Sequence, residues 1–170
     1  MKALNSVVLA VSVGFAHVTF AMPSTHAKAE LKDSKGLSLG TADLEQTPQG
    51  VLLVASLSHL PPGTHAFHIH EKGSCVAPDF KSAGGHFNPK GHQHGARNPQ
   101  GMHEGDLANF TVSAEGQAKI EALLPMSQLR GTQGLLDADG AALVVHAKAD
   151  DYASNPAGNA GGRIACGVIE

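Results

Sequence analysis

Several histidines and acidic residues in this sequence stand at spacings that could bind metal ions. The chain has 170 residues, of which 11 are histidine. In the run GTHAFHIH, residues 63–70, alternate residues of an extended strand point to the same side, so His68 and His70 share one face. This pair could chelate a metal ion or simply form an exposed polar strand face. His65 lies on the opposite, apolar face, and we expect it to be buried with a backbone partner.

A second group of histidines follows in a segment rich in glycine, proline and asparagine. The runs GGHFNPKGHQHG and MHEGDL contain four histidines and an aspartate, namely His86, His92, His94, His103 and Asp106. Three imidazoles and one carboxylate suit tetrahedral Zn²⁺, and a folded loop with such mixed spacing could wrap the ion. The alternative interpretation is a solvated polar loop with a chance excess of histidine.

The run LVVHAKADD, residues 143–151, carries the third group. An apolar segment that reads as a strand ends at His146, and Asp150 follows four residues later. His146 could complete a copper site with His68 and His70. Asp150 could accept hydrogen bonds from ligand histidines and fix their tautomers, although considered singly it reads as a solvated loop acid.

Short segments of alternating apolar and polar residues must position these groups. In residues 51–57 apolar side chains recur at every second position, and a Pro-Pro-Gly turn follows. Residues 109–124 read as a hairpin. No long helix is indicated, and the candidate strands, about eight, are 28–35, 37–46, 51–57, 64–71, the two arms of 109–124, 142–147 and 163–169. The pattern predicts an all-β antiparallel sandwich or barrel.

Two segments break this pattern. Residues 71–105 form a stretch of 35 residues with neither helical nor strand periodicity, and residues 150–162 are similarly rich in Gly, Asn and Pro. Loops of such length in a compact domain are usually functional or disordered. We expect the first loop to be ordered, because a metal ion and a disulfide could both fix it. The chemistry is expected in these two loops.

The start of the chain reads as an export signal. Lys2 supplies a basic region, and a mostly apolar stretch runs to Ala21. Small residues permit cleavage after Ala21 or as late as residue 27. The alternative is a membrane anchor, for which the stretch is at the short limit. We therefore assign residues 1–21 as a signal peptide and residues 28–170 as one domain, a usual length for a single core.

The cysteine count and the net charge indicate the compartment of the protein and exclude some kinds of partner. Export places Cys75 and Cys166, the two cysteines of the chain, in an oxidising compartment, where an even count usually means a disulfide. The formal net charge is −3 with scattered lysines, which argues against nucleic acid because phosphate binding needs concentrated positive charge. No basic amphipathic helix and no later apolar span indicates a membrane partner.

Five stretches, taken in order, resemble the defining motifs of the copper/zinc superoxide dismutase family: GTHAFHIHEKGSC, GGHFNPKGHQHG, MHEGDL, LVVHAKADD and AGNAGGRIACGVI. The resemblance covers residues 51–169. It implies an eight-stranded Greek-key barrel with a long metal-binding loop and a shorter second active-site loop. It also implies one copper and one zinc ion per chain, and disproportionation of superoxide to oxygen and hydrogen peroxide by a redox-cycling copper ion beside a structural zinc.

Carried over residue by residue, the resemblance assigns each ligand. The implied copper ligands are His68, His70, His86 and His146. The implied zinc ligands are His86, His94, His103 and Asp106, so that His86 bridges the two ions. The family's hydrogen-bonding aspartate matches Asp150, its anion-guiding arginine matches Arg163, and its disulfide matches Cys75 with Cys166. His92 has no counterpart and is treated as a loop histidine.

Two departures, together with the leader, resemble a bacterial periplasmic member of the family. Residues 151–162 are shorter than the corresponding loop of eukaryotic members and carry no charge after Asp151, which leaves the source of electrostatic guidance open. Ala157 stands where the cavity rim often carries threonine. Superoxide is the expected partner, and monomer and homodimer both stay open. The alternative function is a periplasmic copper chaperone or buffer on the same fold, which we expect to lack His86 or Arg163.

Overall fold

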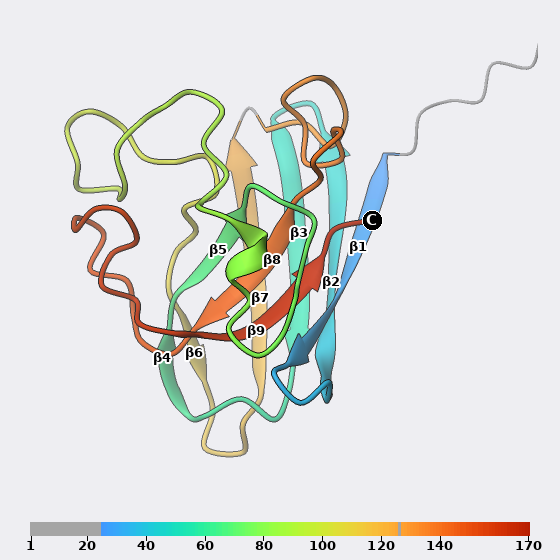
Figure 1. Ribbon diagram of the computed structural model, residues 1–170, viewed down its shortest axis with the longest axis vertical. Coiled ribbons are helices and arrows are strands. Elements are labelled where there is room, and N and C mark those ends of the chain that lie inside the picture. The colour runs from blue at the N-terminus through green and yellow to red at the C-terminus, as the bar shows by residue number, and fades with distance from the viewer. Residues whose placement is uncertain (1–24, 126) are drawn as a thin grey trace, which may run out of the picture.

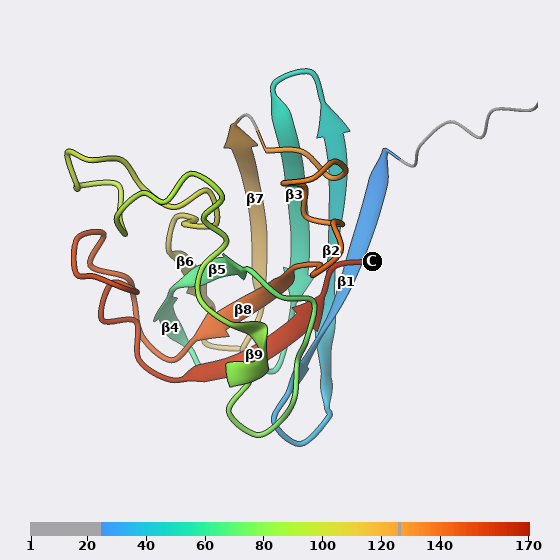
Figure 2. The same ribbon diagram turned by 45° about the horizontal axis from the view of Figure 1, so that its top comes forward.

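A curled antiparallel sheet dominates the computed structural model, which describes residues 25–125 and 127–170 (Figure 1 and Figure 2). The expected signal peptide lies outside the described residues. Seven strands form the main sheet in the order β5-β8-β9-β1-β2-β3-β7, and β4 pairs with β6. The strands are β1 (His26–Asp33), β2 (Ser38–Thr47), β3 (Gly50–Leu57), β4 (Gly63–His65), β5 (Phe67–His70), β6 (Phe110–Val112), β7 (Ala118–Pro125), β8 (Ala142–His146) and β9 (Arg163–Val168).

The strand expected at residues 64–71 is divided at Ala66. Before this residue β4 pairs with β6, and after it β5 pairs with β8. The backbone groups of Ala66 form hydrogen bonds outside the β4–β6 and β5–β8 pairings. Its N–H donates to the carbonyl of Lys148 at 2.8 Å, and its carbonyl accepts from the N–H of His146 at 2.9 Å. The chain thus switches sheets here, which gives nine strands instead of eight within the described ranges. The predicted all-β antiparallel class is confirmed.

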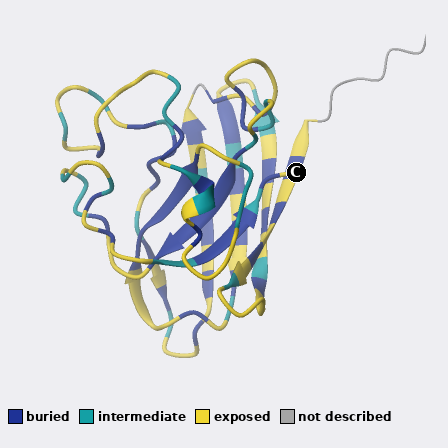
Figure 3. Ribbon diagram, viewed as in Figure 1, coloured by how far each residue is buried: buried dark blue, intermediate teal, exposed yellow. Residues whose placement is uncertain are grey.

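Alternation along the strands fills the interior of the curl. In β3, Val51, Leu53, Ala55 and Leu57 are buried, and Val54 between them faces solvent. The same two-sided pattern colours the neighbouring strands β1, β2 and β7 in Figure 3. Each fully buried leucine contributes about 1.5–3 kcal/mol. The main sheet is therefore a well-supported platform for the strands β5 and β8 that carry the site.

Two long loops lie on the same side of this platform in both views (Figure 1 and Figure 2). One joins β5 to β6 and contains the short 3₁₀ turn η1 (Lys81–Ala83), and the other joins β8 to β9. A disulfide between Cys75 and Cys166 ties the first loop to β9 across 91 residues, with the Cα atoms 5.6 Å apart. The predicted disulfide is confirmed. In the described part of the chain, no helix has the length and hydropathy needed to cross a bilayer.

Candidate metal centre

Strands β5 and β8 present three histidines to the underside of the long loop. His68 and His70 alternate with Phe67 and Ile69 on β5, and His146 ends β8. His68, His70 and His146 are 0%, 1% and 3% exposed, so the loops cover the outer face of these strands. The predicted shared face of His68 and His70 is correct, but this face is deeply buried instead of solvated.

The long loop is laid across β5 so that His86 joins this group. His86 forms a β-bridge with His70, and the neighbouring Phe87 N–H donates to the carbonyl of Ile69 at 2.8 Å. The ligand atoms of the resulting four-histidine cluster all lie within 4.8 Å of one another, and its members are His68, His70, His86 and His146. The sequence of this loop shows no strand periodicity, yet strand-like pairing with β5 fixes its backbone at His86.

Two ring nitrogens in the four-histidine cluster are buried without a hydrogen-bond partner, Nδ1 of His68 and Nε2 of His86. In addition, Nε2 of His70 and Nε2 of His146 face each other at 3.4 Å. An unsatisfied buried polar atom costs about 1–3 kcal/mol, and such atoms are rare in native folds. Their convergence on one point is what a cation bound through nitrogen lone pairs requires.

The nitrogens on the far side of these rings are all occupied. His70 Nδ1 donates to the carbonyl of Gly84 at 3.0 Å, His146 Nδ1 lies 3.4 Å from the carbonyl of Gly161, and His68 Nε2 lies 2.8 Å from a carboxylate oxygen of Asp150. A neutral imidazole that donates from one nitrogen presents a lone pair at the other. The surrounding acceptors therefore select the tautomers that suit a metal ion at the centre of the cluster.

A second group, the mixed cluster, consists of His86, His94, His103 and Asp106. Oδ1 of Asp106 lies 2.7 Å from Nδ1 of His86, 3.0 Å from Nδ1 of His94 and 3.2 Å from Nδ1 of His103. Nδ1 of His103 and Nδ1 of His86 are 3.4 Å apart. A tetrahedral ion with bonds of about 2.0–2.1 Å sets its donor atoms about 3.3–3.4 Å apart. The four donors are thus already close to the edges of a zinc-sized tetrahedron.

Backbone groups hold the Asp106 carboxylate in this position. Its second oxygen, Oδ2, accepts hydrogen bonds from the N–H of Gly95 at 2.8 Å and from the N–H of His103 at 3.0 Å. This leaves Oδ1 to face the histidines. The sequence run MHEGDL therefore folds as a tight turn in which the aspartate closes back on the histidine three residues before it.

Asp150 joins the two clusters. Its Oδ2 contacts His68 of the four-histidine cluster, and its Oδ1 lies 3.0 Å from Nε2 of His94 in the mixed cluster. These three residues also lie close enough to count as a metal-sized group. However, His68 turns its Nδ1 into the four-histidine cluster and His94 turns its Nδ1 toward Asp106 in the mixed cluster. The Asp150 carboxylate therefore serves as the acceptor for their Nε2 atoms.

The same contacts set the charge state of the site. Burial lowers the pKa of His70 to about 2 and that of His146 to about 3, with the neighbouring histidines adding to the effect. At His94 burial also opposes the charged form, but hydrogen bonds to Asp106 and Asp150 outweigh it and raise the pKa to about 9. Since the nitrogen that binds a metal must be free of its proton, a cation and a proton compete at His94.

Both carboxylates stay ionised in this setting. Burial would raise the pKa of each, but the hydrogen bonds from His68 and His94 lower the pKa of Asp150 to about 2. Hydrogen bonds from His86 and His94 likewise hold the pKa of Asp106 well below its usual range. Two negative charges beside the histidine ring nitrogens favour the binding of divalent cations, which must displace the proton held at His94.

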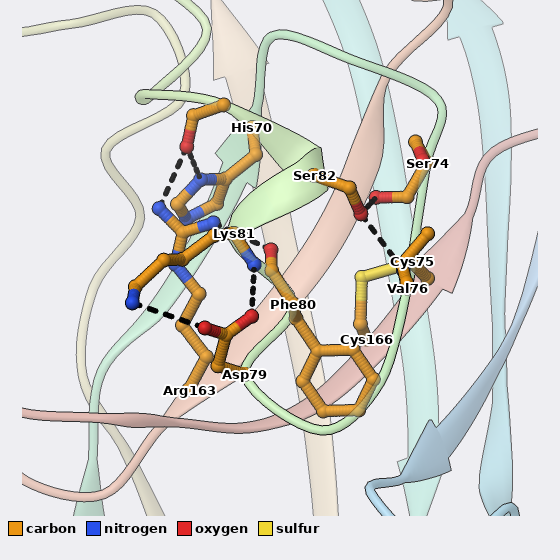
Figure 4. The surroundings of a disulfide bond; sticks show 11 residues. His70, Ser74, Cys75, Val76, Asp79, Phe80, Lys81, Ser82, Arg163 and Cys166 are labelled. Carbon is orange, nitrogen blue, oxygen red and sulfur yellow. Dashed lines mark hydrogen bonds and ion pairs between the residues drawn. A yellow bond between two sulfur atoms is a disulfide. The ribbon is translucent and has the colours of Figure 1, made fainter.

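Arg163 lies at the edge of the four-histidine cluster, where β9 begins beside His146. Its Nη1 donates to the carbonyl of Phe80 and its Nη2 to the carbonyl of Gly84, both at 2.6 Å (Figure 4). Arg163 is half-buried. Because the Gly84 carbonyl also accepts from His70 Nδ1, the guanidinium is held next to the four-histidine cluster.

Sequence reasoning missed the residues that hold Asp150. The Asn109 side chain pairs with the Asp150 backbone in both directions, donating to its carbonyl and accepting from its N–H, each at 2.8 Å. The Asn109 N–H donates to the hydroxyl of Tyr152, also at 2.8 Å. The only sequence signal was that Asn109 stands three residues after Asp106. His65, as expected, is buried with its ring nitrogens on the carbonyls of His146 and Pro61.

His92 lies apart from both clusters. It is exposed, and its Nδ1 lies 3.1 Å from the carbonyl of Met102. The backbone around it is fixed by Asn88, whose side chain pairs with the N–H and the carbonyl of His92. The treatment of His92 as a loop histidine therefore agrees with its place in the fold.

A curled Greek-key sheet that carries two donor clusters sharing one histidine defines a protein built around a two-metal centre. The family model described as copper/zinc superoxide dismutase matches residues 38–169. The chain belongs to the copper/zinc superoxide dismutase family. It is an oxidoreductase of that family, which uses copper and zinc and disproportionates superoxide to oxygen and hydrogen peroxide.

Individual relatives agree with this assignment. The chain is 48% identical over 146 residues to superoxide dismutase [Cu-Zn] 2 of Aquifex aeolicus, covering 84% of this chain and 85% of the relative. It is 46% identical over 148 residues to superoxide dismutase [Cu-Zn] of Caulobacter vibrioides, covering 85% of each. Among solved structures, a SOD-like protein from Bacillus subtilis superposes with a TM-score of 0.80 at 41% identity, covering 86% of this chain and 99% of that one.

Proposed function

We propose that the four-histidine cluster holds the copper ion of this superoxide dismutase, that the mixed cluster holds its zinc ion, and that His86 bridges the two. The observation that carries the proposal is the orientation of the His86 ring. Its Nδ1 faces Asp106 at 2.7 Å in the mixed cluster, and its Nε2 is buried without a partner in the four-histidine cluster. One ring with a nitrogen in each donor set is suited to bind two ions at once.

Copper, when bound, supplies one-electron redox chemistry toward superoxide, whereas zinc has no redox chemistry and supplies charge and shape. The protein supplies orientation and protons. Disproportionation consumes two superoxide ions and two protons and releases one O₂ and one H₂O₂, so the half-reaction that forms peroxide needs proton delivery. His86 Nε2 is a buried ring atom that could hold and release such a proton whenever it does not serve as a metal ligand, while Asp150, Gly84 and Gly161 keep the other rings in place.

Arg163 supplies the positive charge that attracts superoxide. Two of its five N–H groups are directed to the carbonyls of Phe80 and Gly84, which leaves others free for a small anion. Because Gly84 also accepts from His70, the guanidinium is tied to the same backbone atom as a proposed copper ligand. A cation fixed at the edge of the four-histidine cluster raises the local concentration of anions there.

Metal analysis of protein refolded with both ions tests the assignment. We expect one copper and one zinc per chain in the wild type. His146→Ala should lose copper and keep zinc, and His103→Ala should lose zinc and keep copper. His92→Ala is the matched control and should keep both ions. A zinc-free enzyme with full activity would refute the roles given to His94, His103 and Asp106, and activity that survives complete chelation would refute the copper assignment.

Export is a further part of the proposal. We propose that residues 1–21 direct the chain to the periplasm and are then removed. Cleavage near Ala21 fits the fold better than cleavage at residue 27, because Ala27 is buried and pairs with Leu44 in β1 and β2. Mass spectrometry of the N-terminus of protein recovered from the periplasm tests this site, and an N-terminus at residue 28 would contradict it.

The partners of the mature chain also belong to the proposal. Met102 and Leu123 are 39% and 49% exposed and line one groove of about 640 Å³ between the long loop and β7. Exposed apolar side chains on one face favour contact with another protein surface, and we propose a homodimer through this face. The net charge of −3 supports no nucleic-acid or anionic-membrane partner. Light scattering of Leu123→Lys should show a shift toward monomer, and an unchanged mass would contradict the proposed interface.

A further inference from the structure

Phe80 adopts a backbone conformation that aromatic residues rarely take. Its φ is 53° and its ψ is 22°, in the left-handed region, where the Cβ atom of a non-glycine residue is crowded. The side chain is only 2% exposed, and it lies beside the disulfide in Figure 4. A strained backbone at a buried side chain is maintained only when the surrounding packing determines it.

The packing around Phe80 is separate from the main core. A small apolar cluster forms between the long loop and strands β8 and β9, and its members are Phe80, Ala83, Ala142, Val144 and Cys166, with Cys75 packed against it. Phe80 is the largest side chain in this group. It is therefore the residue that fixes the loop segment around η1 to the sheet by contact.

Both ends of the turn that begins at Phe80 bind Arg163. The Phe80 carbonyl accepts from Arg163 Nη1 at 2.6 Å and from the Ala83 N–H at 3.2 Å. The Gly84 carbonyl accepts from Arg163 Nη2 at 2.6 Å and from His70 Nδ1 at 3.0 Å. The turn thus acts as a clamp of two carbonyls, whose spacing and direction depend on how its first residue is held.

We propose that Phe80 is the positioning residue for Arg163: its buried ring holds the backbone of the turn so that the carbonyls of Phe80 and Gly84 grip the guanidinium. The inference rests on the guiding role proposed for Arg163. The disulfide fixes the loop at Cys75, five positions earlier, but the hydrogen bonds of Arg163 go to the turn. The packing of the Phe80 ring therefore fixes the two carbonyls of the turn, and these carbonyls in turn fix the position of the Arg163 guanidinium.

A chemical probe of the metal-free protein tests this position without any measurement of activity. The chain has three arginines, Arg97, Arg130 and Arg163, and the first two are exposed. Phenylglyoxal modifies accessible guanidinium groups, and peptide mapping follows each arginine separately. In Phe80→Ala we expect Arg163 to react several times faster than in the wild type while Arg97 and Arg130 keep their rates. Phe80→Leu retains apolar bulk and should restore most of the protection.

Leu53→Ala is the matched control, a truncation in the main core on β3 away from this cluster. Equal acceleration of Arg163 in Leu53→Ala, or equal acceleration of all three arginines in Phe80→Ala, would show general loosening and overturn the inference. An unchanged Arg163 rate in Phe80→Ala would also overturn it. Thermal melts identify any variant that fails to fold. If Phe80→Ala fails, Phe80→Val, which removes most of the ring's bulk, serves as the test variant: a faster reaction confined to Arg163 supports the inference, and an unchanged Arg163 rate overturns it.

Kinetics on the metal-loaded enzyme separate this inference from the guiding role itself. We expect Phe80→Ala to lower the second-order rate constant by up to about tenfold in the wild-type background. In the Arg163→Ala background the same change should have almost no effect, because the group that it positions is gone. Equal effects in both backgrounds would overturn the positioning role. If Arg163→Ala alone has no effect, the guiding role is wrong, while the phenylglyoxal rates still decide whether Phe80 holds Arg163.

Discussion

The carboxylate of Asp150 lies 3.0 Å from Nε2 of His94, and its other oxygen lies 2.8 Å from Nε2 of His68. His94 belongs to the mixed cluster and His68 to the four-histidine cluster. A single side chain on the second loop therefore orients one ring in each donor set. Because the Asp150 backbone is itself paired with the Asn109 side chain, the carboxylate has little freedom to move.

Replacement of Asp150 should consequently weaken both metal sites. Loss of an acceptor behind a ligand histidine typically costs about 10–100-fold in metal affinity, and we expect Asp150→Ala to show a loss of this size for zinc and for copper. Competition with a chromophoric chelator measures both. Asp151→Ala is the control, because the Asp151 carboxylate binds Ser154 and Asn159 and neither cluster. A variant that weakens only one ion would contradict the shared role.

Gly158 offers a steric test of the same carboxylate. A methyl group at this position would collide with Asp150 Oδ1 and come within 2.7 Å of His94 Nε2, and the φ of 63° is already unfavourable for alanine. Gly91 has nearly the same φ, 65°, with nothing within 4 Å. Gly91→Ala should therefore cost only the backbone term of about 1–2 kcal/mol.

Gly158→Ala should be more destabilising than Gly91→Ala and should also lower zinc affinity. Urea unfolding of both apo variants and chelator competition of both holo variants make the comparison. Equal stability losses and equal zinc affinities in the two variants would show that the collision with Asp150 is relieved at no cost.

Much of the site could be predicted because metal ligands are chemically distinctive. The alternation that places His68 and His70 on one face and the apolar run that ends at His146 are visible in the sequence, and the structure brings these residues together. The strand pattern likewise gave the all-β class. What the pattern did not show is the division of one strand at Ala66, since a switch between two sheets leaves the alternation of side chains almost unchanged.

The residues that orient the ligands were less visible, for a physical reason. Gly84 and Gly161 act through backbone carbonyls, which every residue has, so the residue type carries no signal for this role. Asn109 and Tyr152 act through side chains, but they contact the backbone of a distant loop. Such contacts depend on how the two irregular loops pack against each other. Irregular loops have no periodicity, so this packing could not be inferred from the sequence.

The disulfide should contribute substantially to stability. It closes a long loop, with the two cysteines 91 positions apart. Chain entropy for a loop of this size corresponds to roughly 4 to 5 kcal/mol. The double variant Cys75→Ala, Cys166→Ala should lose about this free energy of unfolding, measured by urea denaturation of the apo protein. Reduced wild type provides the matched comparison, and a loss below about 2 kcal/mol would contradict the expectation.

Arg163 should govern the rate at which substrate arrives, without affecting the fold. Enzymes of this class work near the diffusional ceiling, so association limits the rate and a positive charge at the mouth increases it. Arg163→Ala should lower the second-order rate constant roughly tenfold. Metal content and melting temperature should stay near wild type, because the side chain is only half-buried and the carbonyls that it leaves can bind water. Arg130→Ala, an exposed arginine, is the control.

Ionic strength separates this electrostatic role from a loss of local structure. Attraction of a monoanion by a partly exposed cation is screened over about 10 Å at 0.1 M salt, so the wild-type rate should fall as salt is added. Arg163→Glu reverses the charge: it should be slower than Arg163→Ala, and its rate should fall less, or rise, with salt. Pulse-radiolysis kinetics on metal-replete variants measures these slopes. If Arg163→Ala stays within about a factor of two of wild type and the three slopes coincide, the guiding charge lies elsewhere.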